Sequence, residues 1–192
     1  MKSKFLCFLL IAPLSVSCSS DYSPKPKGYF RIDLPEPVYH DLLRFPDFTC
    51  SISDQVRVDE VNDTVNKNKI AFNLIYPRYR AQIYCTCFRI NAPDFSVFSE
   101  ESRRMAYFQE QKAKGIKETA YDHPEQKVYG LVYEIDGNAA SPIQFVITDS
   151  TKSFFRGALY FDTSLNRDSI APVLAYINKD IHVMMESFQW KQ

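Results

Sequence analysis

The sequence has no excess of charge of either sign. Its 192 residues include 23 lysines and arginines and 23 aspartates and glutamates. A nucleic-acid-binding protein needs a basic face, and this balance offers no support for one. After the first 17 residues, no apolar run approaches the roughly 20 residues that a membrane-spanning helix needs. These two absences argue against a nucleic acid partner and against a membrane-spanning helix in the body of the chain.

The sequence also lacks the short motifs of common catalytic and nucleotide-binding sites. It contains no GxSxG, HExxH, GxxxxGKS/T or GxGxxG pattern. The histidines His40, His123 and His182 lie far apart along the chain, and separate roles are expected for them. We therefore expect no enzyme, no cofactor and no metal site. A hydrolase without a recognisable motif would require folding to bring a serine, a histidine and an aspartate together.

What the sequence does contain starts with a leader. Two lysines precede an apolar stretch over residues 5–16, and the small residue Ser17 precedes Cys18. This order is typical of a bacterial lipoprotein signal peptide. We predict that residues 1–17 are removed and that the thiol of Cys18 carries diacylglycerol. Several acyl chains, at about 0.8 kcal/mol per buried methylene, hold a folded domain on a membrane.

The residues around Cys18 give information on the cleavage site and on the membrane to which the chain is sorted. Leu14 lies four residues before Cys18, whereas a lipoprotein signal usually has the leucine one residue nearer. A secreted protein that is cleaved elsewhere is therefore the alternative. Ser19 stands in place of the acidic residue that retains many lipoproteins in the inner membrane. This favours a cell-envelope lipoprotein of the outer membrane, facing the periplasm, over one of the inner membrane.

The segment that follows the leader is rich in proline. Residues 18–44 contain four prolines, which fix the backbone and remove N–H donors, so we predict a tether. Four apolar side chains of this segment are expected to lie against the domain: Tyr29, Phe30, Ile32 and Leu34. Residues 45–192 are enough to bury a core, and we expect them to form a single globular α+β domain.

The first half of this domain mixes strand and helix patterns. Residues 70–76 and 82–90 read as strands, and the proline-containing segment 77–79 between them predicts a hairpin. The polar run 59–69 is expected to be a loop. Residues 94–115 place phenylalanine and methionine at helical spacing, which predicts a helix.

The C-terminal half predicts three strands and a second helix. Residues 128–136, 143–148 and 154–161 have strand patterns separated by short turns. A parallel connection needs about a dozen residues, so these strands are expected to form an antiparallel meander. Residues 168–188 carry an apolar stripe at helical spacing. The expected fold class is α+β, an antiparallel sheet packed with two main helices over 94–115 and 168–188.

Aromatic residues and cysteines suit such a sheet. The 12 tyrosines and 15 phenylalanines favour a sheet-rich core, with an aromatic-lined ligand pocket as the alternative. Cys85 and Cys87 lie two apart on a predicted strand, so their side chains share one face. We expect buried thiols; the alternative is a disulfide between Cys50 and one of the pair.

Four stretches of the chain resemble the gliding-motility lipoprotein GldD family of Bacteroidetes. They are CSSDYSPKPKGYFRIDLPE (18–36), IYPRYRAQIY (75–84), ESRRMAYFQEQKA (101–113) and the C-terminal region from VYGLVYEIDGNAAS to AYINKDI (128–181). The most specific part is GNAAS followed by TDSTKxFxRGALYF. The resemblance implies a role in gliding motility and in the associated type IX protein secretion, as an envelope lipoprotein. It implies lipid on Cys18 and transfers no catalytic residue.

The resemblance also implies protein partners in the gliding and secretion machinery, with a GldE-type membrane protein as one candidate. We expect a non-enzymatic adaptor, and a binding module for a lipid or cell-wall ligand is the alternative function. The candidate contact surface consists of turn residues and one strand arginine: Gly137, Asn138, Ser141, Asp149, Lys152 and Arg156. The turn residues have the alternative role of shaping hairpins. Arg156 interrupts an apolar strand, where it lies on the solvent face or pairs with a carboxylate.

Overall fold

A computed structural model describes residues 32–61, 68–108, 113–162 and 167–191. The predicted leader and Cys18 lie outside these residues. The strands are β1 (Tyr39–Asp41), β2 (Phe48–Thr49), β3 (Ser51–Ser53), β4 (Arg57–Val61), β5 (Lys69–Tyr76), β6 (Ala81–Arg89), β7 (Ala113–His123), β8 (Val128–Gly137), β9 (Ile143–Thr148), β10 (Ser153–Phe161) and β11 (Gln189–Trp190). The main helices are α1 (Phe95–Tyr107) and α2 (Arg167–Ser187), and short 3-10 helices are η1 (Pro77–Tyr79), η2 (Ala92–Asp94) and η4 (Pro124–Gln126).

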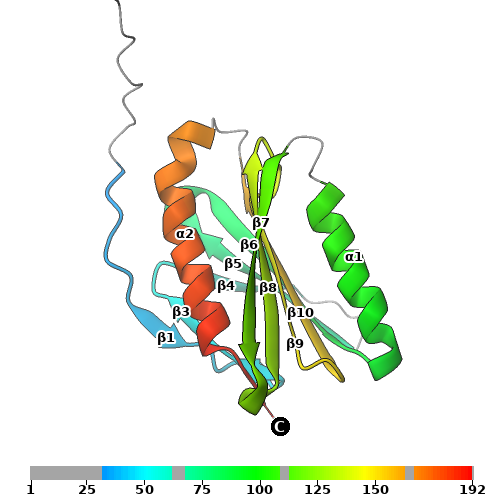
Figure 1. Cartoon of the computed structure of the whole chain (residues 1–192). Helices are drawn as coiled ribbons and strands as arrows, with labels where there is room; N and C mark the ends of the chain where they lie inside the picture. The colour runs from blue at the N-terminus through cyan, green and yellow to red at the C-terminus, as the bar shows by residue number, and fades with distance from the viewer. Residues whose placement is uncertain (1–31, 62–67, 109–112, 163–166, 192) are drawn as a thin grey trace, which may run out of the picture.

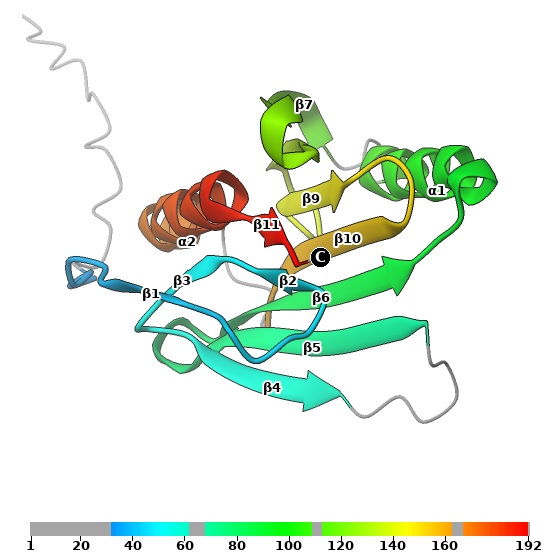
Figure 2. The same cartoon turned by 90° about the horizontal axis from the view of Figure 1, so that it is seen from below.

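A seven-stranded antiparallel sheet forms the centre of the fold. Its strand order is β4-β5-β6-β10-β9-β8-β7. The two helices lie on opposite sides of this sheet (Figure 1). Two small pairs, β1 with β3 and β2 with β11, lie on the α2 side (Figure 2). The α+β fold class is therefore confirmed, as is the meander of β8, β9 and β10.

The predicted hairpin between β5 and β6 is present. Tyr76 pairs with Ala81, and η1 fills the turn between them. Arg80 closes this turn in the left-handed conformation, with φ at 50°. Beyond this local hairpin, β6 pairs along its whole length with β10, which comes far later in the chain. That non-local pairing joins the two halves of the sequence into one sheet.

The prediction of a helix over 94–115 is correct at its start and wrong at its end. Helix α1 begins at Phe95 and stops at Tyr107, and strand β7 begins at Ala113. Residues 109–112 lie outside the described residues. Pairing with β8 along nearly its whole length outweighs the local helical spacing at the end of the predicted range. His123 is the last residue of β7.

Part of the predicted loop over 59–69 is also a strand. Strand β4 (Arg57–Val61) pairs with β5 and forms one edge of the sheet. An edge strand carries charged side chains because it has no neighbour on one side and little cover. Its polar composition therefore resembles that of a loop. Lys69, the last residue of the predicted loop, begins β5.

The folded domain starts before residue 45. Tyr39–Asp41 form β1, and Leu42 is buried in the core. Ile32 and Leu34 pack against the core, as expected for the end of the tether. Tyr29 and Phe30 lie outside the described residues. The domain thus includes the C-terminal part of the segment predicted to be a tether.

The main core lies between the sheet and α2. Phe48 is at its centre, with its ring 5.2 Å from that of Phe188 and 5.3 Å from that of Phe155. Cys50, Cys85 and Cys87 are buried and unbonded. Burial raises the pKa of the Cys50 and Cys87 thiols to about 12. The interpretation of these cysteines as buried thiols agrees with this structure.

Candidate functional site: a groove between helix α1 and the sheet

Helix α1 is fixed to the sheet at both of its ends. Near its start, the Phe98 ring lies 5.0 Å from that of Phe88 and 5.6 Å from that of Phe154. At its end, Tyr107 packs edge-on against Tyr133, and its hydroxyl donates to Glu118 at 2.8 Å. These contacts set the distance between the helix and the sheet.

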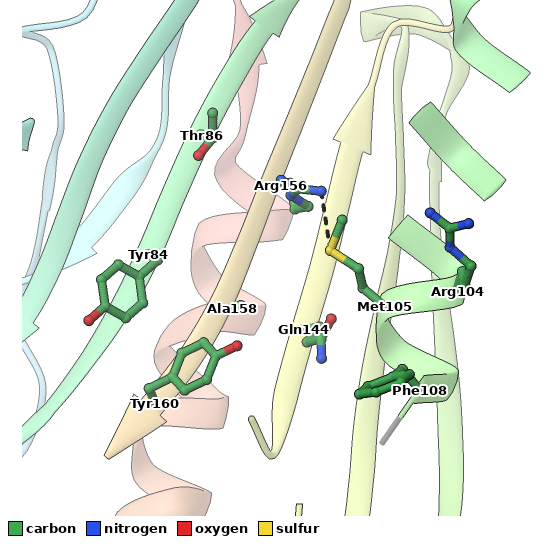
Figure 3. A pocket seen from close by; sticks show the side chains of 9 residues that line it. All are labelled: Tyr84, Thr86, Arg104, Met105, Phe108, Gln144, Arg156, Ala158 and Tyr160. Carbon is green, nitrogen blue, oxygen red and sulfur yellow. Dashed lines mark hydrogen bonds between the residues drawn. The ribbon is translucent and has the colours of Figure 1, made fainter. Parts of the chain in front are cut away.

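A groove of about 570 Å³ lies between the C-terminal half of α1 and strands β6, β10 and β9. This volume is within the range of small-molecule binding sites. Figure 3 shows the side chains that line it: Tyr84, Thr86, Arg104, Met105, Phe108, Gln144, Arg156, Ala158 and Tyr160. We call this feature the α1 groove.

The α1 groove is deep at its centre because one strand position in its floor has a small side chain. Ala158 on β10 lies between Tyr84 on β6 and Gln144 on β9 in the sheet register. Side chains alternate along a strand, so its neighbours Gly157 and Leu159 face the α2 core instead. A methyl group at this point leaves space that a larger residue would fill.

Aromatic rings stand on both sides of the floor. The rings of Tyr84 and Tyr160 meet edge to face with their centres 5.4 Å apart. Tyr84 is 46% exposed. The amide of Gln82 donates to the Tyr84 hydroxyl. Phe108, at the end of α1, is 77% exposed. Exposed rings that flank one depression are unusual for side chains whose only role is packing.

The charge of the α1 groove is positive. Arg156 is half-buried; its Nη1 donates to the Met105 Sδ at 3.4 Å, and its guanidinium lies 5.7 Å from the Phe88 ring centre. A thioether is a weak acceptor. Arg104 is exposed, and none of the nine lining residues is acidic. The sequence left two positions open for Arg156, and the structure places it in the groove wall without a carboxylate among the described residues.

The other members of the candidate contact surface lie elsewhere. Gly137 ends β8, and Asn138 and Ser141 belong to the β8–β9 connection that follows it. Asp149 and Lys152 belong to the turn at the other end of β9. A six-residue strand separates these turns by about 20 Å. The six predicted residues therefore do not form one continuous surface. Contact of either turn with a partner stays a prediction.

Two of these turn residues have clear structural roles. The Ser141 side chain is fully buried, and its hydroxyl donates to the carbonyl of Ile143 at 3.2 Å. The Asp149 carboxylate accepts the backbone N–H groups of Thr151, Lys152 and Ser153 at 2.7–2.9 Å. Burial opposes ionisation of Asp149, but these donors together lower the pKa of its carboxyl. Both residues shape hairpins.

The histidines remain apart in the fold. His40 is exposed on β1 and His123 is exposed at the end of β7. His182 on α2 pairs with the hydroxyl of Tyr121. None of the three lines the α1 groove. In the part of the chain that the structure describes, no group of three or more histidine, cysteine, aspartate or glutamate side chains is arranged to hold a metal ion, and no helix is long and apolar enough to cross a membrane.

A buried polar network ties the first strand to the core. Tyr39 on β1 donates to Asp180 Oδ1 at 2.8 Å, and Tyr76 on β5 donates to Oδ2 at 3.1 Å. Asp180 is only 4% exposed, and burial raises the pKa of its carboxyl although the tyrosine hydroxyls counteract this effect. The network joins the chain immediately after the tether to α2 and to the sheet.

Sequence reasoning identified Arg156 and missed the rest of the groove and this network. Asp180 has a signal in the sequence, because it lies seven residues after Val173 and four before Met184 on the buried stripe of α2. An acid on such a stripe indicates a buried hydrogen-bonded carboxylate. The groove residues have no comparable signal, since they come from four separate elements.

The fold and the groove define a class of protein: an α+β domain with a packed core on one face of its sheet and an open, positively charged groove on the other. A family model described as gliding motility lipoprotein GldD matches residues 19–190. The chain belongs to this family, and the resemblance seen in the sequence is confirmed. No curated protein matches the chain. The family is one of lipoproteins, which agrees with an association with the cell envelope.

Proposed function

We propose that this protein is a lipid-anchored, non-enzymatic component of the gliding-motility machinery and of the associated type IX secretion apparatus. The observation that carries the proposal is the family match over residues 19–190. The match begins at residue 19, directly after Cys18, and its description names a lipoprotein. The proposal includes a mature chain that starts with a lipidated Cys18. The protein acts as an adaptor that docks on envelope partners.

The composition of the groove supports the absence of catalysis. A hydrolytic site needs a general base within hydrogen-bond reach of a nucleophile or a water. The residues that line the α1 groove include no histidine, aspartate or glutamate, and two of them are arginines. Such a lining is suited to binding and orienting a ligand.

The tether limits how far the domain reaches from its membrane. Ile32 packs against the core, and the part of the predicted tether before it runs from Cys18 to residue 31. Fully extended, this segment spans at most about 50 Å. We propose the outer membrane, facing the periplasm, as its location. Protein partners such as a GldE-type membrane protein would be met within that reach.

The experiment that tests the anchor is the substitution Cys18→Ala in the chromosomal gene. The expected result is release of the chain from the membrane fraction and loss of colony spreading. Cys7→Ala, within the predicted leader, is the matched control and should leave both unchanged. Normal spreading of cells whose Cys18→Ala chain is released would overturn the tethering role.

The link to secretion needs a separate readout. Cells that lack the protein should retain a type IX cargo protein that wild-type cells release into the medium. Normal release of this cargo by cells that do not spread would restrict the protein to motility. Photo-crosslinking from Asn138 and from Lys152, in the two turns at opposite ends of β9, would show which end contacts a partner.

A second candidate function is an envelope binding module for a lipid or cell-wall ligand. The α1 groove favours it, because a volume of about 570 Å³ lined by aromatic rings and unpaired cations suits a small ligand. This function is compatible with the adaptor role, since a ligand in the groove can be part of what the domain recognises.

A further inference from the structure

We propose that the α1 groove binds an anionic lipid, an acyl chain that carries a carboxylate or phosphate head. This inference rests on the second candidate function and names its ligand class. Two properties of the groove carry it: cations without an acidic partner, and a floor and walls built from apolar and aromatic side chains.

The two arginines provide the site for the anionic head. A guanidinium offers five N–H donors that match a carboxylate or phosphate in pairs. Among the described residues, the Arg156 side chain donates only to the Met105 sulfur, and its charge lies near the Phe88 ring. Arg104, on α1, makes no ion pair with the described residues. A half-buried guanidinium without a carboxylate is a ready site for an anion.

An amide next to these cations has no protein partner among the described residues. Gln144 lines the α1 groove, and its side chain makes no hydrogen bond to them. The nitrogen and oxygen of this amide stay accessible from the open groove. A ligand with polar oxygens near the floor would accept a hydrogen bond from it.

The remaining surface of the groove is suited to an acyl chain. Ala158 and Met105 form its apolar floor and side, and the rings of Tyr84, Tyr160 and Phe108 stand around it (Figure 3). Methionine adapts its shape to irregular apolar ligands. Covering the exposed Phe108 ring with a chain would remove apolar surface from water.

The combination of charge and apolar surface selects among envelope ligands. A neutral sugar would leave both guanidiniums unpaired, and a small inorganic anion would leave the rings exposed. An acidic peptide would pair with the arginines but has little apolar surface for the floor. An anionic lipid satisfies both parts of the groove, and the proposed anchor keeps the domain near a source of such lipids.

The test measures binding of the fluorescent fatty acid cis-parinaric acid to the purified full chain. The chain carries Cys18→Ala, so that no acyl group of its own competes. Palmitate should displace the probe, and methyl palmitate, which lacks the charge, should be weaker by about tenfold or more. Acetate and inorganic phosphate, which have a head and no chain, should not displace it.

Variants locate the binding in the groove. Arg104→Gln and Arg156→Gln should each weaken palmitate by about tenfold, because a charge-assisted hydrogen bond is lost. Ala158→Phe should abolish binding by filling the floor. Ala120→Phe, at an exposed position on edge strand β7, is the matched control and should bind as the parent chain does. The exposed Arg104 side chain makes no hydrogen bond or ion pair with the described residues, so the Arg104→Gln chain should fold even if another variant does not.

Three results would overturn the inference: no displacement by palmitate, equal displacement by palmitate and its methyl ester, or binding unchanged in Ala158→Phe. Tighter displacement by an acidic peptide would mean that the groove takes a protein partner. Displacement by a soluble peptidoglycan fragment alone would keep the binding module and exclude the lipid. The spreading of Cys18→Ala cells is measured separately, so failure here leaves the anchor and adaptor roles unaffected.

Discussion

The two faces of the central sheet differ in how completely they are covered. On the α2 face, the Phe155 and Leu159 side chains are fully buried. On the α1 face, Ala158 and Tyr160 of the same strand border an open groove. Strand β10 therefore contributes alternate residues to a packed core and to a candidate ligand site. The difference separates residues that determine stability from residues that are available for binding.

The helices show the same contrast. Helix α2 (Arg167–Ser187) buries a long stripe in the main core, whereas α1 (Phe95–Tyr107) contributes only Ser102 and Ala106 as buried residues. Contacts at the two ends of α1 keep it in place, while Arg104, Met105 and Phe108 at its C-terminal end line the groove. Substitutions on the α2 face should therefore cost stability, and those on the α1 face should cost binding.

The largest expected effect on stability comes from deleting a core ring. Phe155→Ala should lower the free energy of unfolding by about 3–5 kcal/mol, because it leaves a cavity among packed rings. Phe108→Ala, which truncates a ring that is 77% exposed, should change it by less than about 0.5 kcal/mol. Urea denaturation of the two variants measures the difference. Equal losses would contradict the contrast between the faces.

Adjacent positions of β10 give a sharper version of this comparison. A Cβ at Gly157 would lie 2.1 Å from the Phe145 Cζ on the α2 face, so Gly157→Ala should cost about 1–3 kcal/mol through overpacking. Ala158→Val points into the groove and should cost less than about 0.5 kcal/mol. Thermal and urea unfolding of both variants test this. A larger cost at residue 158 would mean that the groove is closed in solution.

The polar network at Asp180 should contribute about 1–3 kcal/mol to the free energy of unfolding. Asp180→Ala leaves the hydroxyls of Tyr39 and Tyr76 without their buried acceptor, and each lost partner is costly. Limited proteolysis should then release residues near β1 first, since Tyr39 is their link to α2. Unchanged stability and unchanged cleavage would argue that β1 is held by its pairing with β3 alone.

Asp180 also predicts a pH dependence with a definite sign. Burial raises the pKa of this carboxyl in the folded state, so the folded chain holds the proton more tightly than the unfolded chain. The contribution of Asp180 to the free energy of unfolding is therefore greatest below the unfolded pKa and falls as pH rises through the folded pKa. Unfolding measured across this range should show the decline. Asp180→Asn should remove this component, and an identical pH profile would contradict the assignment.

The smallest effect is expected in the chemical labelling of the three cysteines, which lie on the α2 face. Burial raises the pKa of Cys50 and Cys87 to about 12, and that of Cys85 well above its usual value. The thiolate is the reactive form, so iodoacetamide at pH 8 should leave all three unmodified in the folded chain and should modify them in urea. Mass spectrometry of the peptides measures the extent of labelling at each cysteine. Rapid labelling of the native protein would show that the core opens readily.

Local signals were enough for part of this fold. Short turns and clear periodicity placed the β8–β10 meander and α2, whose bounds differ from those predicted by one residue at each end. Strands β4 and β7 were missed because they lie at the two edges of the sheet, where charged residues replace a clear alternation. The end of α1 was placed too late because pairing of β7 with β8 is not visible in a local pattern.

The groove could not be predicted, for a related reason. It requires β6 and β10 to be neighbours, although they are distant in the sequence, and it requires α1 to cross the same face. The alternation of Arg156, Ala158 and Tyr160 shows that these residues share a face, but it does not show what covers that face. The buried role of Ser141 was likewise hidden, because the sequence of a turn does not reveal which side chain points inward.

We infer that the open α1 face, rather than the packed α2 face, is the functional surface of this domain, which we propose is anchored to a membrane by lipid on Cys18. The most direct test compares the spreading of cells that carry Ala158→Phe with that of cells that carry Ala120→Phe, at equal levels of membrane-bound protein and equal unfolding midpoints. Ala158→Phe should abolish spreading, and Ala120→Phe should not. Normal spreading with a filled groove would contradict it.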